Sequence, residues 1–172
     1  ICERAKPQGA WVHVDGAFGL WAAASSQYRP LVAGVERADS WATDAHKWLN
    51  VPSDSGVAFV RDSDALKAAM AISAAYLPTE SEHRNPSDYT PELSRRARGV
   101  EVWAALSELG RHGVARLVER CCDHAQHFAR ELGAAGFEIL NEVVLNQVLV
   151  SFGDSAETVS YTHLRAHETV VY

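Results

Sequence analysis

The stretch Thr43-Asp44-Ala45-His46-Lys47-Trp48-Leu49 places a lysine between a histidine and a tryptophan. Most lysines are solvated at the protein surface, so this lysine alone does not indicate chemistry. Residues 40–43 have the composition of a short strand, which would carry Asp44 to Lys47 to its end. The stretch therefore leaves two interpretations of Lys47: a solvated loop charge, or an amine kept for a reaction.

A second stretch, His13-Val14-Asp15-Gly16-Ala17-Phe18-Gly19, bears on this choice. Residues 10–14 are β-prone and apolar, and they predict a buried parallel strand that ends at Asp15. Ligands bind at the carboxyl ends of the strands in open α/β sheets. Because Asp15 and Lys47 both follow such strands, we expect them to meet at one edge of a doubly wound sheet.

The segment after the lysine motif predicts a third strand, a helix and a loop. The third strand covers residues 56–61, and the helix covers residues 64–70 with Asp62 or Ser63 as its N-cap. Residues 76–91 are polar and rich in turn formers, and a long loop of this kind inside a compact domain is usually functional or disordered.

The next segment, residues 93–134, has a helical pattern. Gly110 and Gly113 are expected to divide it into two helices. Apolar residues recur at three- and four-residue spacing in both helices: Val100, Trp103, Ala104, Leu106 and Leu109 in the first, and Leu117, Val118, Cys121, Ala125, Phe128 and Leu132 in the second. Residues 137–140 and 147–152 predict two strands of a further unit.

The composition indicates a soluble, globular protein. The chain has 172 residues, of which 47% are hydrophobic and 22% charged, with a net charge of −6. The longest basic block is Arg95-Arg96-Ala97-Arg98, so we expect no nucleic-acid partner. No apolar run is long enough to span a bilayer, and we expect neither a signal peptide nor a membrane location. The cysteines Cys2, Cys121 and Cys122 have no metal-ligand spacing and favour reduced thiols in the cytoplasm.

The two motifs together, with Asp15 thirty-two positions before Lys47, resemble the group II pyridoxal-phosphate-dependent amino-acid decarboxylases. The resemblance runs over residues 10–152. It implies an α/β fold of the aspartate-aminotransferase-like type (fold type I), with a mostly parallel sheet and flanking helices. It also implies pyridoxal 5'-phosphate as cofactor, an L-amino acid as substrate, an amine and carbon dioxide as products, and a homodimer as the full-length assembly.

The resemblance implies a role for four residues of the two motifs. Asp15 matches the buried carboxylate that keeps the pyridine nitrogen of the cofactor protonated, because an opposite charge favours the protonated form. Ala17 matches the small residue packed against one face of the ring. Lys47 matches the Schiff-base lysine, and burial is expected to favour its neutral amine. His46 matches the histidine near the cofactor phosphate. Many relatives carry asparagine in place of Asp44, which has no assigned role.

The resemblance also covers the loop and the basic block. Tyr76 matches a tyrosine on a mobile catalytic loop that supplies a proton to the α-carbon after carbon dioxide leaves. Relatives that form aldehydes carry phenylalanine there, so Tyr76 favours decarboxylation. The stretch Ser94-Arg95-Arg96-Ala97-Arg98-Gly99 is interpreted as a structural helix start near the dimer interface, with phosphate binding as the alternative.

The family's subunit is much longer than this chain, so we interpret the chain as an internal fragment that is inactive on its own. Residues 1–115 correspond to the C-terminal half of the large domain that binds the cofactor. Residues 116–158 correspond to the linking helix and the start of the small α/β domain. Residues 159–169 resemble one reading frame of a sequencing adapter, so residues 159–172 are expected to be a non-native tail.

Three functional interpretations remain open from the sequence. The first is the decarboxylase, and the second is another fold-type-I enzyme such as an aminotransferase or a desulfurase-like lyase. The third is a non-catalytic relative, which requires that neither Asp15 nor Lys47 has a role in catalysis or cofactor binding. From the residues alone, Asp15 is also compatible with a turn, His46 with a core histidine, and Tyr76 with an ordinary half-buried tyrosine.

Overall fold

The computed structural model describes residues 1–72 and 84–153. The chain forms two compact units, Ile1–Val118 and Glu119–Tyr172. The assignment of residues 1–115 and 116–158 to two domains stays a prediction. The first unit contains, in chain order, α1 (Cys2–Ala5), η1 (Lys6–Gln8), β1 (His13–Asp15), η2 (Gly19–Ala24), η3 (Arg29–Val32), η4 (Val35–Arg37), β2 (Ser40–Asp44), α2 (Ala45–Trp48), β3 (Gly56–Val60), α3 (Ser63–Met70), η5 (Pro86–Tyr89) and the first part of α4 (Gly99–Ala134).

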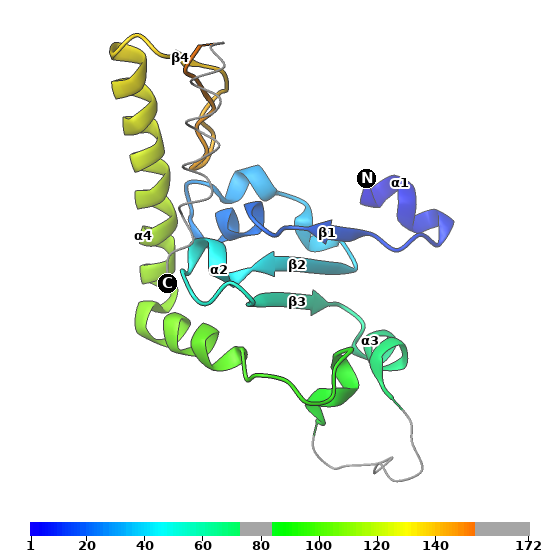
Figure 1. The fold of residues 1–172 in the computed structure, drawn as a ribbon. Coiled ribbons are helices and arrows are strands. Elements are labelled where there is room, and N and C mark those ends of the chain that lie inside the picture. The colour runs from blue at the N-terminus through cyan, green and yellow to red at the C-terminus, as the bar shows by residue number, and fades with distance from the viewer. Residues whose placement is uncertain (73–83, 154–172) are drawn as a thin grey trace. The chain divides into compact units, whose positions relative to one another are not determined.

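The sheet of the first unit has the strand order β1-β2-β3 (Figure 1). β1 and β2 are parallel, with Asp15 opposite Ala42. β2 and β3 are antiparallel, with Trp41 opposite Phe59. The parallel pair has the arrangement that the sequence predicts, because both strands carry their motif at the carboxyl end. The direction of β3 was not predicted.

β1 is shorter than the expected strand over residues 10–14. The backbone N–H of Val12 donates to the side chain of Asp39 at 2.9 Å, rather than to a neighbouring strand. The indole Nε1 of Trp11 donates to Ser40 Oγ at 2.8 Å. The Val12 carbonyl also accepts from the backbone N–H groups of Asp39 and Ser40, at 2.8 and 3.3 Å, so both side-chain and backbone contacts hold the residues before His13 beside β2.

The core of the first unit lies around Ala45, Leu49 and Val114. Partly buried apolar residues from η2, the connection between α2 and β3, β3 itself and the first part of α4 pack against these three residues; they are Trp21, Ala24, Val51, Val57, Val102, Ala105, Leu109 and Leu117. The predicted helix over this part of α4 is confirmed, but of the apolar residues predicted for its first half only Leu109 packs against this core. Val100, Trp103 and Leu106 are exposed.

Two predicted helix boundaries are confirmed. The Asp62 carboxylate accepts hydrogen bonds from the N–H groups of Asp64 and Ala65, both at 3.0 Å, and so caps α3. Gly110 has φ 58° and ψ 179°, which interrupts the helical conformation inside α4. Positive φ is readily adopted only by glycine, so the kink lies where the sequence permits it.

The second unit contains the remainder of α4, followed by β4 (Glu138–Ile139) and β5 (Val150–Ser151). The two strands pair antiparallel, and each is shorter than the sequence predicts. The rings of Phe137 and Phe152 lie 5.2 Å apart beside them. Among the described helices, none combines the length and the apolar character that a membrane crossing requires.

Candidate functional site

The two sequence motifs are joined by backbone hydrogen bonds at the carboxyl ends of β1 and β2. The N–H of Gly16 donates to Ala42 O at 2.9 Å, and the N–H of Asp44 donates to Ala17 O at 3.0 Å. The N–H of Ala17 donates to the Asp15 carboxylate at 3.2 Å, so the turn after β1 is closed by the side chain of Asp15. The predicted meeting of the two motifs at one edge of the sheet is therefore confirmed.

Gly16 is the residue that permits this close approach. A Cβ atom at this position would lie 2.7 Å from Leu20 Cβ and 3.1 Å from Ala42 O. Such distances are shorter than ordinary van der Waals contacts, so any larger residue would separate the turn from β2. The glycine of the first motif thus has a packing role that the sequence interpretation did not assign.

The strand register also fixes which side chains share a face of the sheet. Alternate residues of a strand point to opposite faces, and paired residues of neighbouring strands point to the same face. Asp15 is paired with Ala42, so Asp15 and Asp44 lie on one face. Thr43 is paired with Val57 on the other face, where Val57 contributes to the core.

The short helix α2 is fixed in place by two tryptophans. The indole of Trp48 is buried, its Nε1 donates to Phe18 O at 2.9 Å, and its ring lies 5.2 Å from that of Phe18. The indole Nε1 of Trp21 donates to Asp44 O at 3.0 Å. These contacts join α2 to the turn after β1, and they set the direction in which Lys47 leaves the helix.

Lys47 lies at the carboxyl edge of β2, and its amine is paired with Asp44. The distance from Lys47 Nζ to Asp44 Oδ2 is 3.0 Å, and the Lys47 side chain is 39% exposed. The expected burial of Lys47 is wrong for the described residues, as is the expected burial of the Asp15 carboxylate.

His46 is oriented by the turn that precedes β3. Its Nδ1 lies 3.3 Å from Ser55 O, which also accepts the N–H of Ala45 at 3.1 Å. A hydrogen bond to a carbonyl requires a proton on Nδ1, so the ring presents Nε2 to Asp44, 3.8 Å away.

Among the described residues, the buried hydroxyls of Thr43 and Ser55 have no hydrogen-bond partner.

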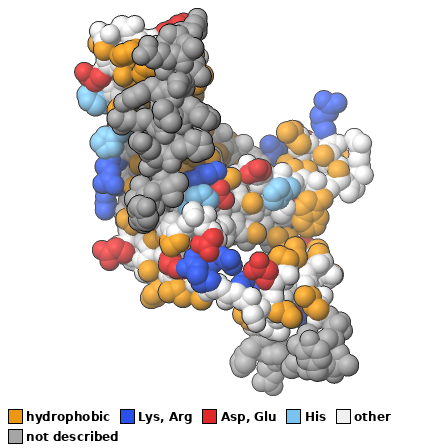
Figure 2. All heavy atoms as spheres, in the orientation of Figure 1, with side chains coloured by type: hydrophobic (Ala, Val, Ile, Leu, Met, Phe, Trp, Pro, Cys, Tyr) orange, Lys and Arg blue, Asp and Glu red, His pale blue; other side chains and the backbone are white. Residues whose placement is uncertain are grey.

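The arginine-rich stretch before α4 forms an ion-pair network around Asp54. Arg96 binds the Asp54 carboxylate with two nitrogens, at 2.6 and 3.1 Å, and Arg98 binds it at 3.0 Å. Figure 2 shows basic and acidic side chains gathered over this stretch. The Arg96 guanidinium, followed by that of Arg98, lowers the pKa of Asp54 to about 2. Arg96 also pairs with Glu101, and these hydrogen bonds raise the pKa of Arg96.

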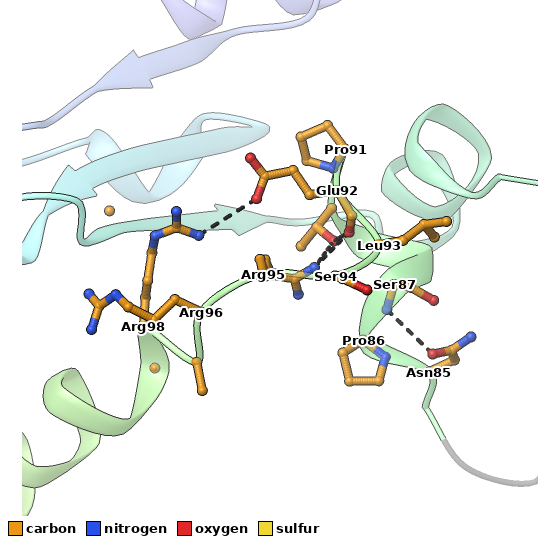
Figure 3. A pocket seen from close by; sticks show the side chains of 14 residues that line it. Asn85, Pro86, Ser87, Pro91, Glu92, Leu93, Ser94, Arg95, Arg96 and Arg98 are labelled. Carbon is orange, nitrogen blue, oxygen red and sulfur yellow. Dashed lines mark hydrogen bonds and ion pairs between the residues drawn. The ribbon is translucent and has the colours of Figure 1, made fainter.

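A cavity of about 860 Å³ lies beside this network, between Gly56 and residues 85–99. Figure 3 shows the side chain of Arg98 directed to Glu92, with a distance of 3.6 Å between Nη1 and the carboxylate. Arg95 donates to Thr90 Oγ1 at 2.6 Å. Because each of these arginines already has a partner, the geometry supports the structural interpretation of the stretch over phosphate binding.

Two predictions from the sequence lie outside the described residues. They are the role of Tyr76 and the non-native character of residues 159–172. Within residues 1–72 and 84–153, no group of three or more histidine, cysteine, aspartate or glutamate side chains is placed to hold a metal ion.

Asp44 is the residue of this site that the sequence interpretation missed. Its backbone N–H and carbonyl bind Ala17 and Trp21, and its carboxylate pairs with Lys47 and approaches His46. One signal was present in the sequence: an aspartate three positions before the lysine, at the end of a predicted strand, where the following turn brings the two side chains together.

Known proteins resemble this chain along most of its length. A tyrosine/DOPA decarboxylase of Papaver somniferum is 34% identical over 132 residues, which are 74% of this chain and 25% of that protein. A phenylacetaldehyde synthase of Petunia hybrida is 31% identical over 132 residues, which are 74% of this chain and 26% of that protein. The chain thus spans about a quarter of the length of these relatives.

A solved structure of Oryza sativa TDC with PLP and tryptamine superimposes with a TM-score of 0.77 at 27% identity, and the match covers 86% of this chain and 31% of that one. The family model described as "Pyridoxal-dependent decarboxylase conserved domain" matches residues 1–153. The fold-type-I fold expected from the two motifs is thereby confirmed, and the chain belongs to the pyridoxal-dependent decarboxylase family.

Proposed function

We propose that the protein that contains this chain converts an L-amino acid into an amine and carbon dioxide with pyridoxal 5'-phosphate as cofactor. The observation that carries the proposal is the meeting of Asp15 and Lys47 at one edge of the sheet, through the bonds between Gly16 and Ala42 and between Asp44 and Ala17. Membership of the pyridoxal-dependent decarboxylase family supports the same reaction.

The residues at this edge fit the cofactor chemically. Within the described residues, only the Ala17 amide binds the Asp15 carboxylate, which leaves that carboxylate open to a protonated ring nitrogen. Lys47 is accessible to attach the aldehyde, and the Ala17 methyl group is small enough to face an aromatic ring. His46 offers an imidazole for the phosphate. When bound, the cofactor supplies an electron sink for the electrons released as the substrate loses its carboxylate.

The substrate class that the relatives favour is an aromatic L-amino acid. The two plant relatives are named for tyrosine and DOPA and for phenylacetaldehyde, all of which are aromatic. The full-length protein, loaded with pyridoxal phosphate, should release carbon dioxide and the matching amine from an aromatic substrate. A panel of aromatic, acidic and basic L-amino acids tests the class, and amine formation only from non-aromatic substrates would contradict it.

The Lys47→Ala variant tests the proposed reaction itself. Borohydride reduction followed by peptide mapping should locate the cofactor on Lys47 in the natural protein and nowhere in this segment in the variant. Turnover should be lost in the variant. Formation of a keto acid instead of an amine by the natural protein would indicate an aminotransferase and would contradict the proposal.

An aldehyde is the alternative product, because one relative is named as an aldehyde synthase. The proposed role of Tyr76 as proton donor distinguishes the two products. The Tyr76→Phe variant should lose amine formation preferentially while it still consumes substrate. If the natural protein forms aldehyde, or if the variant forms amine at an unchanged rate, Tyr76 does not have this role.

We further propose a homodimer in the cytoplasm. The exposed apolar side chains of Val100, Trp103 and Leu106 recur at helical spacing on α4, which supports a surface that another subunit covers. The free thiols of Cys2, Cys121 and Cys122 are compatible with a reducing compartment. Light scattering of the full-length protein and fractionation of the source cells are the direct measurements.

A further inference from the structure

The three lysines of the chain each have a carboxylate partner, but only Lys47 lies in the candidate site. Lys6 Nζ lies 2.9 Å from Asp39, and Lys67 Nζ lies 3.2 Å from Asp88. The Lys47 pair with Asp44 has a comparable length of 3.0 Å. The Lys6 and Lys47 side chains are equally exposed, at 39%, so the three pairs form an internal comparison set.

Asp44 lies in a backbone segment that hydrogen bonds hold in place. The backbone N–H of Asp44 donates to Ala17 O, and its carbonyl accepts the Trp21 indole, so both sides of the residue are fixed. Asp44 lies at the end of β2 and Lys47 lies on the last turn of α2, so the ion pair spans the strand-to-helix junction. This geometry places the Lys47 amine on the face of the sheet that carries Asp15.

We propose that Asp44 is a positioning residue and counter-ion for Lys47 in the cofactor-free protein. The inference rests on the proposed function in one respect, namely that Lys47 is the lysine that takes the cofactor. The Asp44 carboxylate holds the amine at the carboxyl edge of β2 through an ion pair with an N–O distance of 3.0 Å. Cofactor attachment must therefore break this pair first.

The ion pair affects the attachment of the cofactor to Lys47. Lys47 must lose one proton to water before its nitrogen can bond to the aldehyde carbon of the cofactor, and the aldehyde oxygen then leaves as water. The amine can reach the aldehyde carbon only after it separates from the Asp44 carboxylate, which lies 3.0 Å away. Asp44 thus restrains attachment while it holds the amine in place.

The Asp44→Asn variant removes the charge and keeps the size of the side chain. Trace acetylation of the cofactor-free full-length protein at pH 7, with mass spectrometry of each lysine, measures the reactivity of the free amines. We expect Lys47 in the variant to react about two- to fivefold faster, the range that corresponds to the loss of an exposed ion pair. The rates for Lys6 and Lys67 should not change, which also shows that the variant is folded.

The Asp39→Asn variant is the matched control, because it removes the partner of Lys6 at the other end of β2. It should accelerate acetylation of Lys6 and leave Lys47 unchanged. An unchanged or slower reaction of Lys47 in Asp44→Asn would overturn the proposal. Acceleration of all three lysines in Asp44→Asn would also overturn it, because the effect would then be a loss of structure.

Cofactor attachment provides the second measurement. Stopped-flow absorbance after mixing with pyridoxal phosphate should show faster attachment in Asp44→Asn, and slower attachment would contradict the restraint. The two measurements separate the two proposals. If acetylation responds as expected and borohydride fixes no cofactor on Lys47, the proposal about the ion pair is correct and the proposed function is wrong.

Discussion

Replacement of Gly16 by alanine tests the packing that brings the two motifs together. The added Cβ would meet Leu20 Cβ at 2.7 Å and Ala42 O at 3.1 Å, and the second contact is with backbone, which cannot rotate away. Overpacking of this kind costs about 1–3 kcal/mol. The strain falls on the hydrogen bonds from Gly16 N–H to Ala42 O and from Asp44 N–H to Ala17 O.

Hydrogen exchange of the full-length protein measures this cost locally. A loss of about 1–3 kcal/mol corresponds to roughly 5- to 150-fold faster exchange of amides that open at this junction. Peptides over residues 12–20 and 40–46 should show the change. The reactivity of Lys47 toward acetylation should also change, because Asp44 is anchored through Ala17.

Gly19→Ala is the matched control. A Cβ atom at Gly19 would meet nothing within 4 Å, and Gly19 is not among the glycines with positive φ. Exchange at the junction should therefore stay at its natural rate in this variant. The reasoning is refuted if Gly16→Ala leaves the exchange of both peptides unchanged, or if Gly19→Ala accelerates it equally.

Three further predictions concern the surroundings of the site. Asp62→Ala should destabilise α3 by about 1 kcal/mol through the loss of its N-cap, seen as faster amide exchange in α3, and an unchanged rate would contradict the cap. Trp48→Phe should cost about 0.5–1.5 kcal/mol in urea unfolding, because it removes the bond to Phe18 O, and equal stability would exclude that bond. The pKa of Asp54 is lowered from 3.8 to about 2, so its contribution to stability is present above pH 4 and is lost as the pH falls toward 2. Acid unfolding of Asp54→Asn should lack this loss, and an identical acid transition would refute it.

The sequence predicted the topology around the site better than the environment of each side chain. Asp15 and Lys47 each follow a short β-prone segment, and parallel neighbours place such residues at one edge. That argument requires only local patterns and one rule of sheet architecture. The N-cap at Asp62 and the kink at Gly110 were predictable for the same reason, since each depends on a single residue type in a local conformation.

The core-facing residues of the first helix were only partly predicted, because two rows of apolar residues run along it. Val100, Trp103 and Leu106 form one stripe of helical period. Val102, Ala105 and Leu109 form a second stripe, of which only Leu109 was in the predicted set. Periodicity shows that a helix has an apolar face but does not choose between two stripes. Only the packing around Ala45 and Leu49 shows that the second stripe faces the core.

The position of Lys47 could be predicted from a local pattern, whereas its exposure depends on tertiary contacts. Its position depends on β2 and α2, which this chain contains, whereas its burial depends on atoms over the carboxyl edge of the sheet. In this chain the Lys47 amine pairs with the Asp44 carboxylate at 3.0 Å. An element that covers this edge would remove water from the pair, which strengthens the attraction between the two charges but also adds the cost of desolvating both. The effect of Asp44→Asn on the acetylation of Lys47 in the full-length protein therefore measures which of these two effects is larger.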